Sequence, residues 1–220
     1  MKLDIHRSNL PKLIAIEGPI GVGKSGLALR LAETLDFEAV LESSGSNPFL
    51  ERFYQNRRQT ALQTQLFFLF ERARQVQELR QSELFSKCHI TDFMFEKDRI
   101  FAEANLDADE INLYDNICQH LNIAPLTPDL VIYLQAPAEI LIDRISQRGE
   151  KFDHLDVDYM GQLADAYTSF FHHYDKSTLV IVNAAAIDPV NNNDEYEALV
   201  QFIMSTKQGR HYYNPVPRLL

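Results

Sequence analysis

The sequence predicts an α/β fold in which helices cover both faces of a parallel sheet of about five strands. Short apolar runs alternate along the chain with longer segments of helical periodicity. The apolar runs lack a regular alternation with polar residues, as expected of strands that are buried on both faces. The length of 220 residues suits one domain with a full hydrophobic core, so we expect a single domain spanning residues 1–220.

The elements follow in order from the amino terminus. Strands are predicted at residues 12–17, 38–41, 87–91, 130–134 and 179–182. Helices are predicted at residues 24–36, 60–81, 96–104, 109–121, 138–148, 156–174 and 194–205. A further helix is expected to start at Asn47-Pro48, because an amide cap precedes a proline there. The C-terminal tail, about residues 207–220, is expected to pack on a partner subunit or to be a loose end.

Composition and charge exclude several classes of protein. Lys and Arg total 21 against 31 Asp and Glu, which gives a formal net charge of -10 and argues against nucleic-acid or anionic-membrane binding. No apolar run approaches the roughly 20 residues of a membrane span. The two cysteines have no metal-ligand spacing, and the amino terminus lacks the apolar core of a secretory signal. We therefore expect a cytoplasmic protein.

One motif, GPIGVGKS at residues 18–25, matches the phosphate-loop pattern G-x-x-x-x-G-K-[ST] in full. Glycines at both ends let the backbone curl so that successive N–H groups face phosphate oxygens, and the following helix adds its positive dipole. The lysine reaches the outer phosphates, and the serine hydroxyl binds Mg²⁺. We therefore predict an ATP and Mg²⁺ site that comprises Gly18, Gly21, Val22, Gly23, Lys24, Ser25 and Gly26.

A phosphate loop indicates nucleotide binding but does not identify the reaction. The chain lacks the Asn-Lys-x-Asp motif of G proteins. Its third predicted strand ends in Ile-Thr-Asp92-Phe rather than in the Asp-Glu pair of motor and helicase ATPases. One compact domain with many helical insertions therefore favours a kinase that acts on a small molecule.

Two carboxylates follow predicted strands, and strand ends in a parallel sheet line the ligand crevice. Glu42 follows the second strand, where it can accept a proton from an attacking hydroxyl. Asp92 follows the third strand, where it can hold Mg²⁺ or act as the base itself. The alternative for either acid is a helix cap or a solvated loop carboxylate.

Gln65 and Arg72 lie seven residues apart on the longest predicted helix. At about 100° per residue they fall within about 20° of each other, whereas Gln63 lies on the opposite face. The glutamine amide offers a donor and an acceptor, which suits the edge of a nucleobase. On pattern alone, however, an exposed polar stripe is the favoured interpretation.

Arg144 and Arg148 lie four residues apart on one helix face, and a Gly-Glu-Lys segment follows them. Such a pair can close over phosphates and stabilise charge in the transition state, or it can be a solvated basic helix end. Under the first interpretation we expect these arginines to form one cationic crevice with Lys24 and Arg72.

Taken together, the motifs resemble the deoxyribonucleoside kinase family, and within it the bacterial deoxyadenosine/deoxyguanosine kinase branch. The resemblance extends from about Leu13 to about Ile187. It rests on the combination of GPIGVGKS, Glu42 with NPFLERFY, QLFFLFERAR, DFMFEKDRIFAEANL and DRISQRGEKFD. It implies a P-loop kinase fold with an arginine-bearing lid at about residues 148–155, usually in a homodimer. The implied reaction, in nucleotide salvage, transfers the γ-phosphoryl of ATP to the 5′-hydroxyl of a deoxynucleoside, in this branch a purine one.

The resemblance also implies residue roles. Glu42 matches the general base, and Arg144 and Arg148 match two lid arginines that stabilise the transferred phosphoryl together with Lys24. The third lid position is Glu150 here. The substrate positions of the family match Tyr54 at the sugar 3′-hydroxyl, Gln65 and Arg72 at the base edge, Phe101 stacked on the base, and Asp153 near the 3′-hydroxyl.

The chain departs from the family at the third strand, which usually ends in an acid-Arg-Ser triplet. The local sequence here is Thr91-Asp92-Phe93, and the tryptophan that often lines the base pocket is also absent. Asp92 keeps the Mg²⁺ role if the register shifts by one, but the arginine has no counterpart unless Lys97 or Arg99 replaces it. The missing triplet keeps open a nucleotide-binding regulatory module that does not turn over.

A nucleoside monophosphate kinase such as thymidylate kinase is the other alternative. It needs extra cationic groups around the phosphate of its acceptor. The acids Glu42 and Asp153 near the acceptor sugar argue against it.

Overall fold

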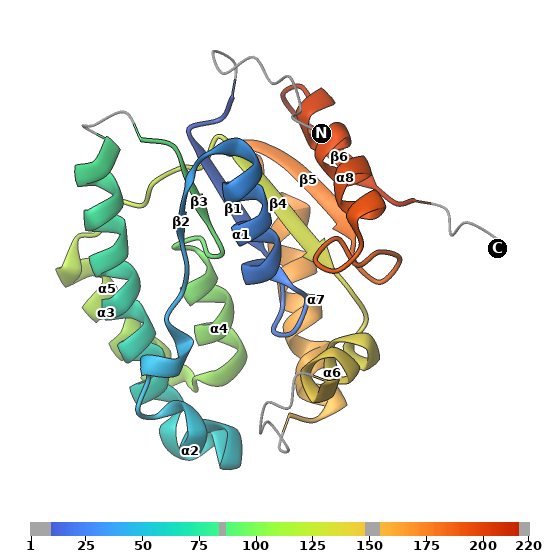
Figure 1. The fold of residues 1–220 in the computed structure, drawn as a ribbon. Helices are drawn as coiled ribbons and strands as arrows, with labels where there is room; N and C mark the ends of the chain where they lie inside the picture. Colours follow the sequence, from blue (N-terminus) through green and yellow to red (C-terminus); the bar gives the residue numbers. More distant parts are fainter. Residues whose placement is uncertain (1–9, 84–86, 148–154, 216–220) are drawn as a thin grey trace.

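The computed structural model describes residues 10–83, 87–147 and 155–215 (Figure 1). Arg148, Asp153, most of the predicted lid and the last five residues lie outside these ranges. The strands are β1 (Leu13–Glu17), β2 (Glu38–Val40), β3 (His89–Thr91), β4 (Leu130–Gln135), β5 (Thr178–Asn183) and β6 (Arg210–Tyr213). The α-helices are α1 (Lys24–Leu35), α2 (Leu50–Gln55), α3 (Arg57–Glu83), α4 (Lys97–Asn105), α5 (Ala108–Leu121), α6 (Ala138–Gln147), α7 (Val157–His173) and α8 (Asn193–Ser205).

Within the described residues the strands form one parallel sheet of six, in the order β2-β3-β1-β4-β5-β6. The predicted α/β class is confirmed, with one strand more than expected. The extra strand is β6, which comes from the predicted tail and pairs with β5 from Leu179↔Arg210 to Val182↔Tyr213. The expectation of a loose end is therefore wrong for these residues, whereas packing of the tail on a partner subunit stays a prediction. Tyr212 is exposed and Tyr213 packs on Phe202, as in a strand. The strand has only four residues, which is too short for the alternation of apolar and polar residues to predict it.

Alternate residues of the central strands face two different hydrophobic cores. Ile14 and Ile16 of β1 pack with α1, α6 and α8, whereas Ala15 between them packs with α4 and α7. The same alternation places Ile132 of β4 in the first core and Tyr133 in the second. Figure 1 shows α1 and α8 on one side of the sheet and α4 and α7 on the other. The period of two that separates these cores is the side-chain period of a strand.

Two helix starts differ from the prediction. The helix after Asn47 begins at Leu50, because the Asn47 side chain accepts from the Phe49 N–H at 3.0 Å and donates to the Thr64 carbonyl at 3.2 Å. It thus joins two segments instead of capping a helix directly. The long helix α3 begins at Arg57 and kinks at Thr60, where the prediction started it. In the part of the chain described here, no helix combines the length and apolar character that crossing a membrane requires.

Candidate active site

The phosphate loop joins β1 to α1 at the point where the strand order reverses. Strands β3 and β4 flank β1, so the sheet continues in opposite directions on its two sides, which is where open α/β sheets bind ligands. Gly18 and Gly23 have φ of 148° and 106°, values that favour glycine. A Cβ at Gly18 would collide with the Leu134 carbonyl of β4. The two glycines that the motif requires therefore sit at positions that exclude other residues.

Lys24 begins α1, and its side chain folds back over the loop. Its ammonium donates to the carbonyls of Gly18 at 2.8 Å and Pro19 at 3.0 Å. Burial and the nearby charge of Lys97 lower the pKa of Lys24 to about 8, although Glu17 and other carboxylates oppose this. The lysine therefore loses its proton more readily than an exposed lysine does.

Asp92 connects the loop to the edge of the sheet. The Ser25 hydroxyl donates to its Oδ2 at 2.5 Å, and the Glu42 backbone N–H donates to its Oδ1 at 2.7 Å. Asp92 itself is buried, just beyond β3. The predicted convergence of the second and third strand ends on the phosphate loop is therefore present.

Glu42 lies beyond the end of β2 between two cations. Arg72 of α3 donates to its Oε1, and the Lys97 ammonium of α4 donates to its Oε2 at 2.6 Å. Burial alone raises the pKa of Glu42, but the charges of Lys97 and Arg72 outweigh that effect and lower it to about 2. The carboxylate is therefore ionised at neutral pH.

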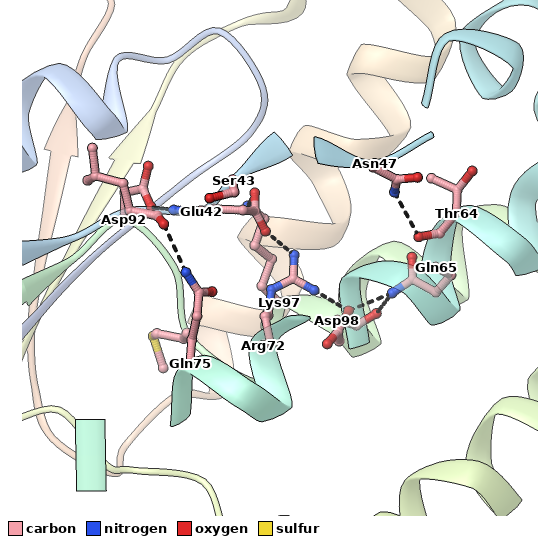
Figure 2. Close-up of polar contacts among 12 residues, drawn as sticks. Glu42, Ser43, Asn47, Thr64, Gln65, Arg72, Gln75, Asp92, Lys97 and Asp98 are labelled. Carbon is pink, nitrogen blue, oxygen red and sulfur yellow. Dashed lines mark hydrogen bonds and ion pairs between the residues drawn. The ribbon is translucent and has the colours of Figure 1, made fainter. Parts of the chain in front are cut away.

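Arg72 also joins Glu42 to a second buried carboxylate. Its other nitrogen donates to Asp98 Oδ1, which also accepts from the Gln65 amide at 2.9 Å. The Gln65 amide donates to the Asp98 carbonyl as well, at 2.8 Å. Figure 2 shows Arg72 between Glu42 and Asp98, with Gln65 beyond. Gln65 and Arg72 thus share one acceptor and one helix face, as their seven-residue spacing predicts, and Gln63 is exposed.

The sequence interpretation missed Asp98. The side chain is 1% exposed, and burial raises its pKa, an effect that the charge of Arg72 opposes. A signal was present, because Asp98, Phe101 and Asn105 follow the i, i+3, i+7 spacing of one helix face. An acid on the same face as a predicted base-stacking residue is a candidate for the same site.

Most of the site residues described above, though not Asp98, line one cavity of about 440 Å³. Its apolar lining includes Leu50, Phe53 and Phe68, and residues of the phosphate loop and Asp92, just beyond β3, line it as well. The cavity brings together most of the predicted side chains, namely Lys24, Ser25, Glu42, Tyr54, Gln65, Arg72, Asp92 and Phe101, with Gly21, Gly23 and Gly26. A second hollow of about 560 Å³, beside β4, β5 and β6, is lined by none of the predicted residues.

Arg144 is placed differently from the expectation. Its guanidinium donates to the carbonyls of Val22 at 3.2 Å, Ala184 at 2.7 Å and Ile187 at 3.2 Å. It therefore ties the phosphate loop to the segment after β5 and does not line the cavity, whose described cationic residues are Lys24, Arg72 and Lys97. The expected cationic crevice forms without Arg144, because backbone carbonyls take up its donors. The predicted loop residues Gly18 and Val22 do not line the cavity either.

A magnesium ion fits the oxygen donors beside the loop. No group of three or more His, Cys, Asp or Glu side chains that could cage a metal occurs among the described residues. Mg²⁺ does not need such a cage, because it commonly binds one or two protein oxygens together with substrate phosphates and waters. The adjacent Ser25 hydroxyl and Asp92 carboxylate match that donor set.

Similarity to known proteins decides the family. The sequence model described as "Deoxynucleoside kinase" matches residues 14–206. The chain belongs to the deoxynucleoside kinase family. The predicted family, the P-loop kinase fold and the kinase activity are thereby confirmed, with ATP as the donor that the family implies and nucleoside salvage as the setting. Family membership argues against the module that does not turn over.

Individual deoxynucleoside kinases resemble the chain over most of its length. Deoxyguanosine kinase of Bacillus subtilis is 30% identical, over 89% of this chain and 97% of the relative. Deoxyadenosine kinase of Lactobacillus acidophilus is 27% identical, over 86% of this chain and 93% of the relative. A solved structure of deoxyadenosine kinase from M. mycoides with bound dATP superposes with a TM-score of 0.76 at 25% identity, and covers 88% of this chain and 100% of its own.

Proposed function

We propose that this kinase transfers the γ-phosphoryl of ATP to the 5′-hydroxyl of a purine deoxynucleoside, deoxyadenosine or deoxyguanosine. One observation carries the proposal. Hydrogen bonds connect the residues of the site: Ser25 bonds Asp92, Asp92 bonds the Glu42 backbone, and the Glu42 side chain is joined through Arg72 and Asp98 to Gln65. A phosphate site at one end and an amide at the other fit a nucleoside whose 5′-hydroxyl reaches Glu42.

In the proposed mechanism Glu42 accepts the proton of the 5′-hydroxyl. The Lys24 ammonium stabilises the charge on the transferred phosphoryl, as Arg148 of the predicted lid is expected to do. Ser25 and Asp92 would hold Mg²⁺, which would supply positive charge against the phosphates. Arg144 supports the loop from behind through its bond to the Val22 carbonyl.

The acceptor end of the cavity fits a deoxynucleoside. Gln65 and Arg72, fixed by Asp98, are proposed to read the base edge. Phe101 lines the same cavity and offers a ring on which a base can stack. Tyr54 and Asp153 are proposed to bind the sugar 3′-hydroxyl. The names of the relatives, deoxyguanosine kinase and deoxyadenosine kinase, support a purine.

A coupled assay with Mg²⁺-ATP and each of the four deoxynucleosides tests this assignment. We expect turnover to be fastest with deoxyadenosine or deoxyguanosine, because the relatives bear those names and the cavity offers Gln65 and Arg72 to a base edge. Thymidine serves as the control acceptor. Well-folded protein that phosphorylates none of the four, or prefers thymidine, contradicts the proposal.

The affinity for ATP is expected to fall as the pH rises through about 8, the pKa of Lys24. Phosphate prefers the protonated ammonium, so affinity weakens by about tenfold per pH unit above that pKa until the bound form also titrates. Titration calorimetry between pH 7 and 9.5 measures the slope. The matched control is Lys24→Arg, whose guanidinium stays charged and removes the slope. Equal slopes in both proteins contradict the role of Lys24.

We also propose a homodimer joined through helices and a cytoplasmic location, both on the family resemblance. Light scattering of the purified protein tests the dimer. A monomer mass at micromolar concentration counts against it.

A further inference from the structure

Lys97 is a buried cation of the cavity that has no part in the mechanism proposed above. Its side chain is 5% exposed, and its ammonium donates to Glu42 Oε2 at 2.6 Å. Among the described residues Glu42 is its one hydrogen-bond acceptor, although an ammonium carries three N–H donors. Because Lys97 lines the cavity, a ligand bound there can take up the remaining donors.

The other cation on Glu42, Arg72, has a different set of partners. Its guanidinium donates to Glu42 on one side and to Asp98 on the other, and Asp98 is 1% exposed. Two carboxylates therefore share the charge of Arg72, whereas the ammonium of Lys97 is bonded to one. Lys97 is thus the cation at Glu42 with the greater capacity to bind a further anion.

Arg99, two residues further on, faces the outside of the molecule. Its side chain is 45% exposed and pairs with Glu103 and Asp115. Phe93, which follows Asp92 in the chain, is buried and brings no charge. Of the two basic residues between β3 and the end of α4, Lys97 is therefore the one that lines the cavity.

The start of α4, which carries Lys97, is tied to the phosphate loop by the buried carboxylate of Glu17. This carboxylate accepts from the Gly18 N–H at 3.1 Å and from the Met94 N–H at 2.6 Å. The Lys97 N–H in turn donates to the Met94 carbonyl at 3.2 Å. The charges of Lys24 and Lys97 act on Glu17 and on each other, so the two ammonium groups lie near one another.

We propose that Lys97 is a further catalytic residue, whose ammonium binds the phosphoryl group during its transfer and then holds the 5′-phosphate of the product. The inference rests on the proposed function, because a phosphoryl group passes from Lys24 toward Glu42 only in that reaction. The 5′-oxygen forms a bond to the γ-phosphorus while the bond from that phosphorus to the β–γ bridging oxygen breaks. The electron pair of the broken bond leaves with ADP, and the hydroxyl proton passes to Glu42. Lys97 offsets the negative charge that arrives.

An ammonium at this place distinguishes the two states of the acceptor. The 5′-hydroxyl of a deoxynucleoside is uncharged, whereas a phosphate monoester carries about −1.5 to −2 elementary charges at pH 7. The contact with Lys97 is therefore expected to be stronger for the transferred phosphoryl and the product than for the substrate. This difference separates a catalytic contact from a general effect on the shape of the cavity.

Isothermal titration calorimetry of Lys97→Met compares the preferred deoxynucleoside with its 5′-monophosphate. Affinity for the monophosphate is expected to fall by about 10- to 100-fold, the effect of one charge-assisted hydrogen bond, and affinity for the deoxynucleoside by less than about threefold. Lys97→Arg keeps a cation and is expected to recover most of the monophosphate affinity. The exposed Arg99→Met is the control and is expected to bind both ligands as the wild type does. Equal losses for the two ligands, or no loss for either, overturn the proposal.

Glu42→Gln separates the charge of Lys97 from its ion pair. Like Lys97→Met it breaks the pair, but it keeps the ammonium and removes a negative charge beside it. Its affinity for the monophosphate is therefore expected to equal or exceed that of the wild type. A loss as large as that in Lys97→Met assigns the effect to the broken pair, and overturns the proposal that the ammonium binds the phosphate.

Single-turnover kinetics with Mg²⁺-ATP at pH 7 give a separate measurement of the transfer step. In Lys97→Met the rate at saturation is expected to fall by about 10²-fold, with the half-saturating concentration of deoxynucleoside within about threefold of the wild type. A change in half-saturation with an unchanged rate overturns the proposal. A wild type that phosphorylates no deoxynucleoside overturns the proposed function instead, and the calorimetric comparison still decides whether Lys97 binds a 5′-phosphate.

Discussion

Replacing Glu42 by glutamine is expected to lower the turnover number by about 10²–10⁴-fold, because the proposed acceptor of the hydroxyl proton is lost. Glutamine has nearly the size of glutamate but presents one oxygen and one NH₂ group. It therefore cannot accept from Arg72 and from Lys97 through two separate oxygens, as Glu42 does. Steady-state kinetics with ATP and the preferred deoxynucleoside measure the loss.

The affinity of Glu42→Gln for ATP separates catalysis from binding. Glu42 contacts Arg72 and Lys97, and among the described residues its link to the phosphate loop runs through Asp92. ATP affinity is therefore expected to stay within a few fold of the wild type. Asp92→Asn is the companion variant, since Asp92 is the other carboxylate at the loop. A near-normal rate in Glu42→Gln together with a large loss in Asp92→Asn would move the base to Asp92.

The low pKa of Glu42, about 2, has consequences for catalysis and for stability. A carboxylate with so low a pKa is a weak base, which suits phosphoryl transfer through a loose transition state, where little proton transfer is needed early. The folded pKa lies below the unfolded value of about 4.3, so the stabilisation from Glu42 is present above that value and is lost as the pH falls toward 2.

Replacing Arg72 by methionine is expected to reduce the free energy of unfolding by about 3–5 kcal/mol. Arg72 is 3% exposed and pairs with two carboxylates, one of which, Asp98, is 1% exposed. Without the guanidinium, Asp98 retains one side-chain donor, the Gln65 amide, and loses the cation that is bonded to it. Urea unfolding followed by circular dichroism measures the change.

A double variant identifies the cause of that loss. Arg72→Met with Asp98→Asn removes the cation and one buried anion together, so part of the lost stability is expected to return. Arg74→Met is the matched control, because Arg74 lies on the same helix but pairs with Glu71 and Glu78 on the surface. It is expected to leave the unfolding curve unchanged. A single Arg72→Met loss below about 1 kcal/mol contradicts the account of this pair.

Local sequence patterns were sufficient to predict the phosphate loop, the helix face that Gln65 and Arg72 share, and the central strands. The glycines at positions 18 and 23 of the motif predict backbone with positive φ, which both residues have. The seven-residue spacing of Gln65 and Arg72 predicts that they share a helix face, and both donate to Asp98. The apolar runs predict the central strands because those strands are buried on both faces.

The remaining features depend on tertiary contacts that no local pattern encodes. β6 forms because β5 offers an open edge, not because its four residues favour a strand. Arg144 turns to carbonyls of the loop and of the segment after β5, which are distant in sequence. Lys97 appears in the sequence as one basic residue among several, and only packing separates it from the exposed Arg99.

The most direct test of the central claim is to follow the labelled γ-phosphoryl of ATP and identify the position that receives it. With deoxyadenosine or deoxyguanosine and Mg²⁺, phosphorus NMR of the product is expected to show coupling of the transferred phosphate to the two 5′ protons. Glu42→Gln is expected to form this product at least about 10²-fold more slowly than the wild type. Recovery of the label as inorganic phosphate, which forms by transfer to water, or at the 3′ position of the nucleoside would contradict the account.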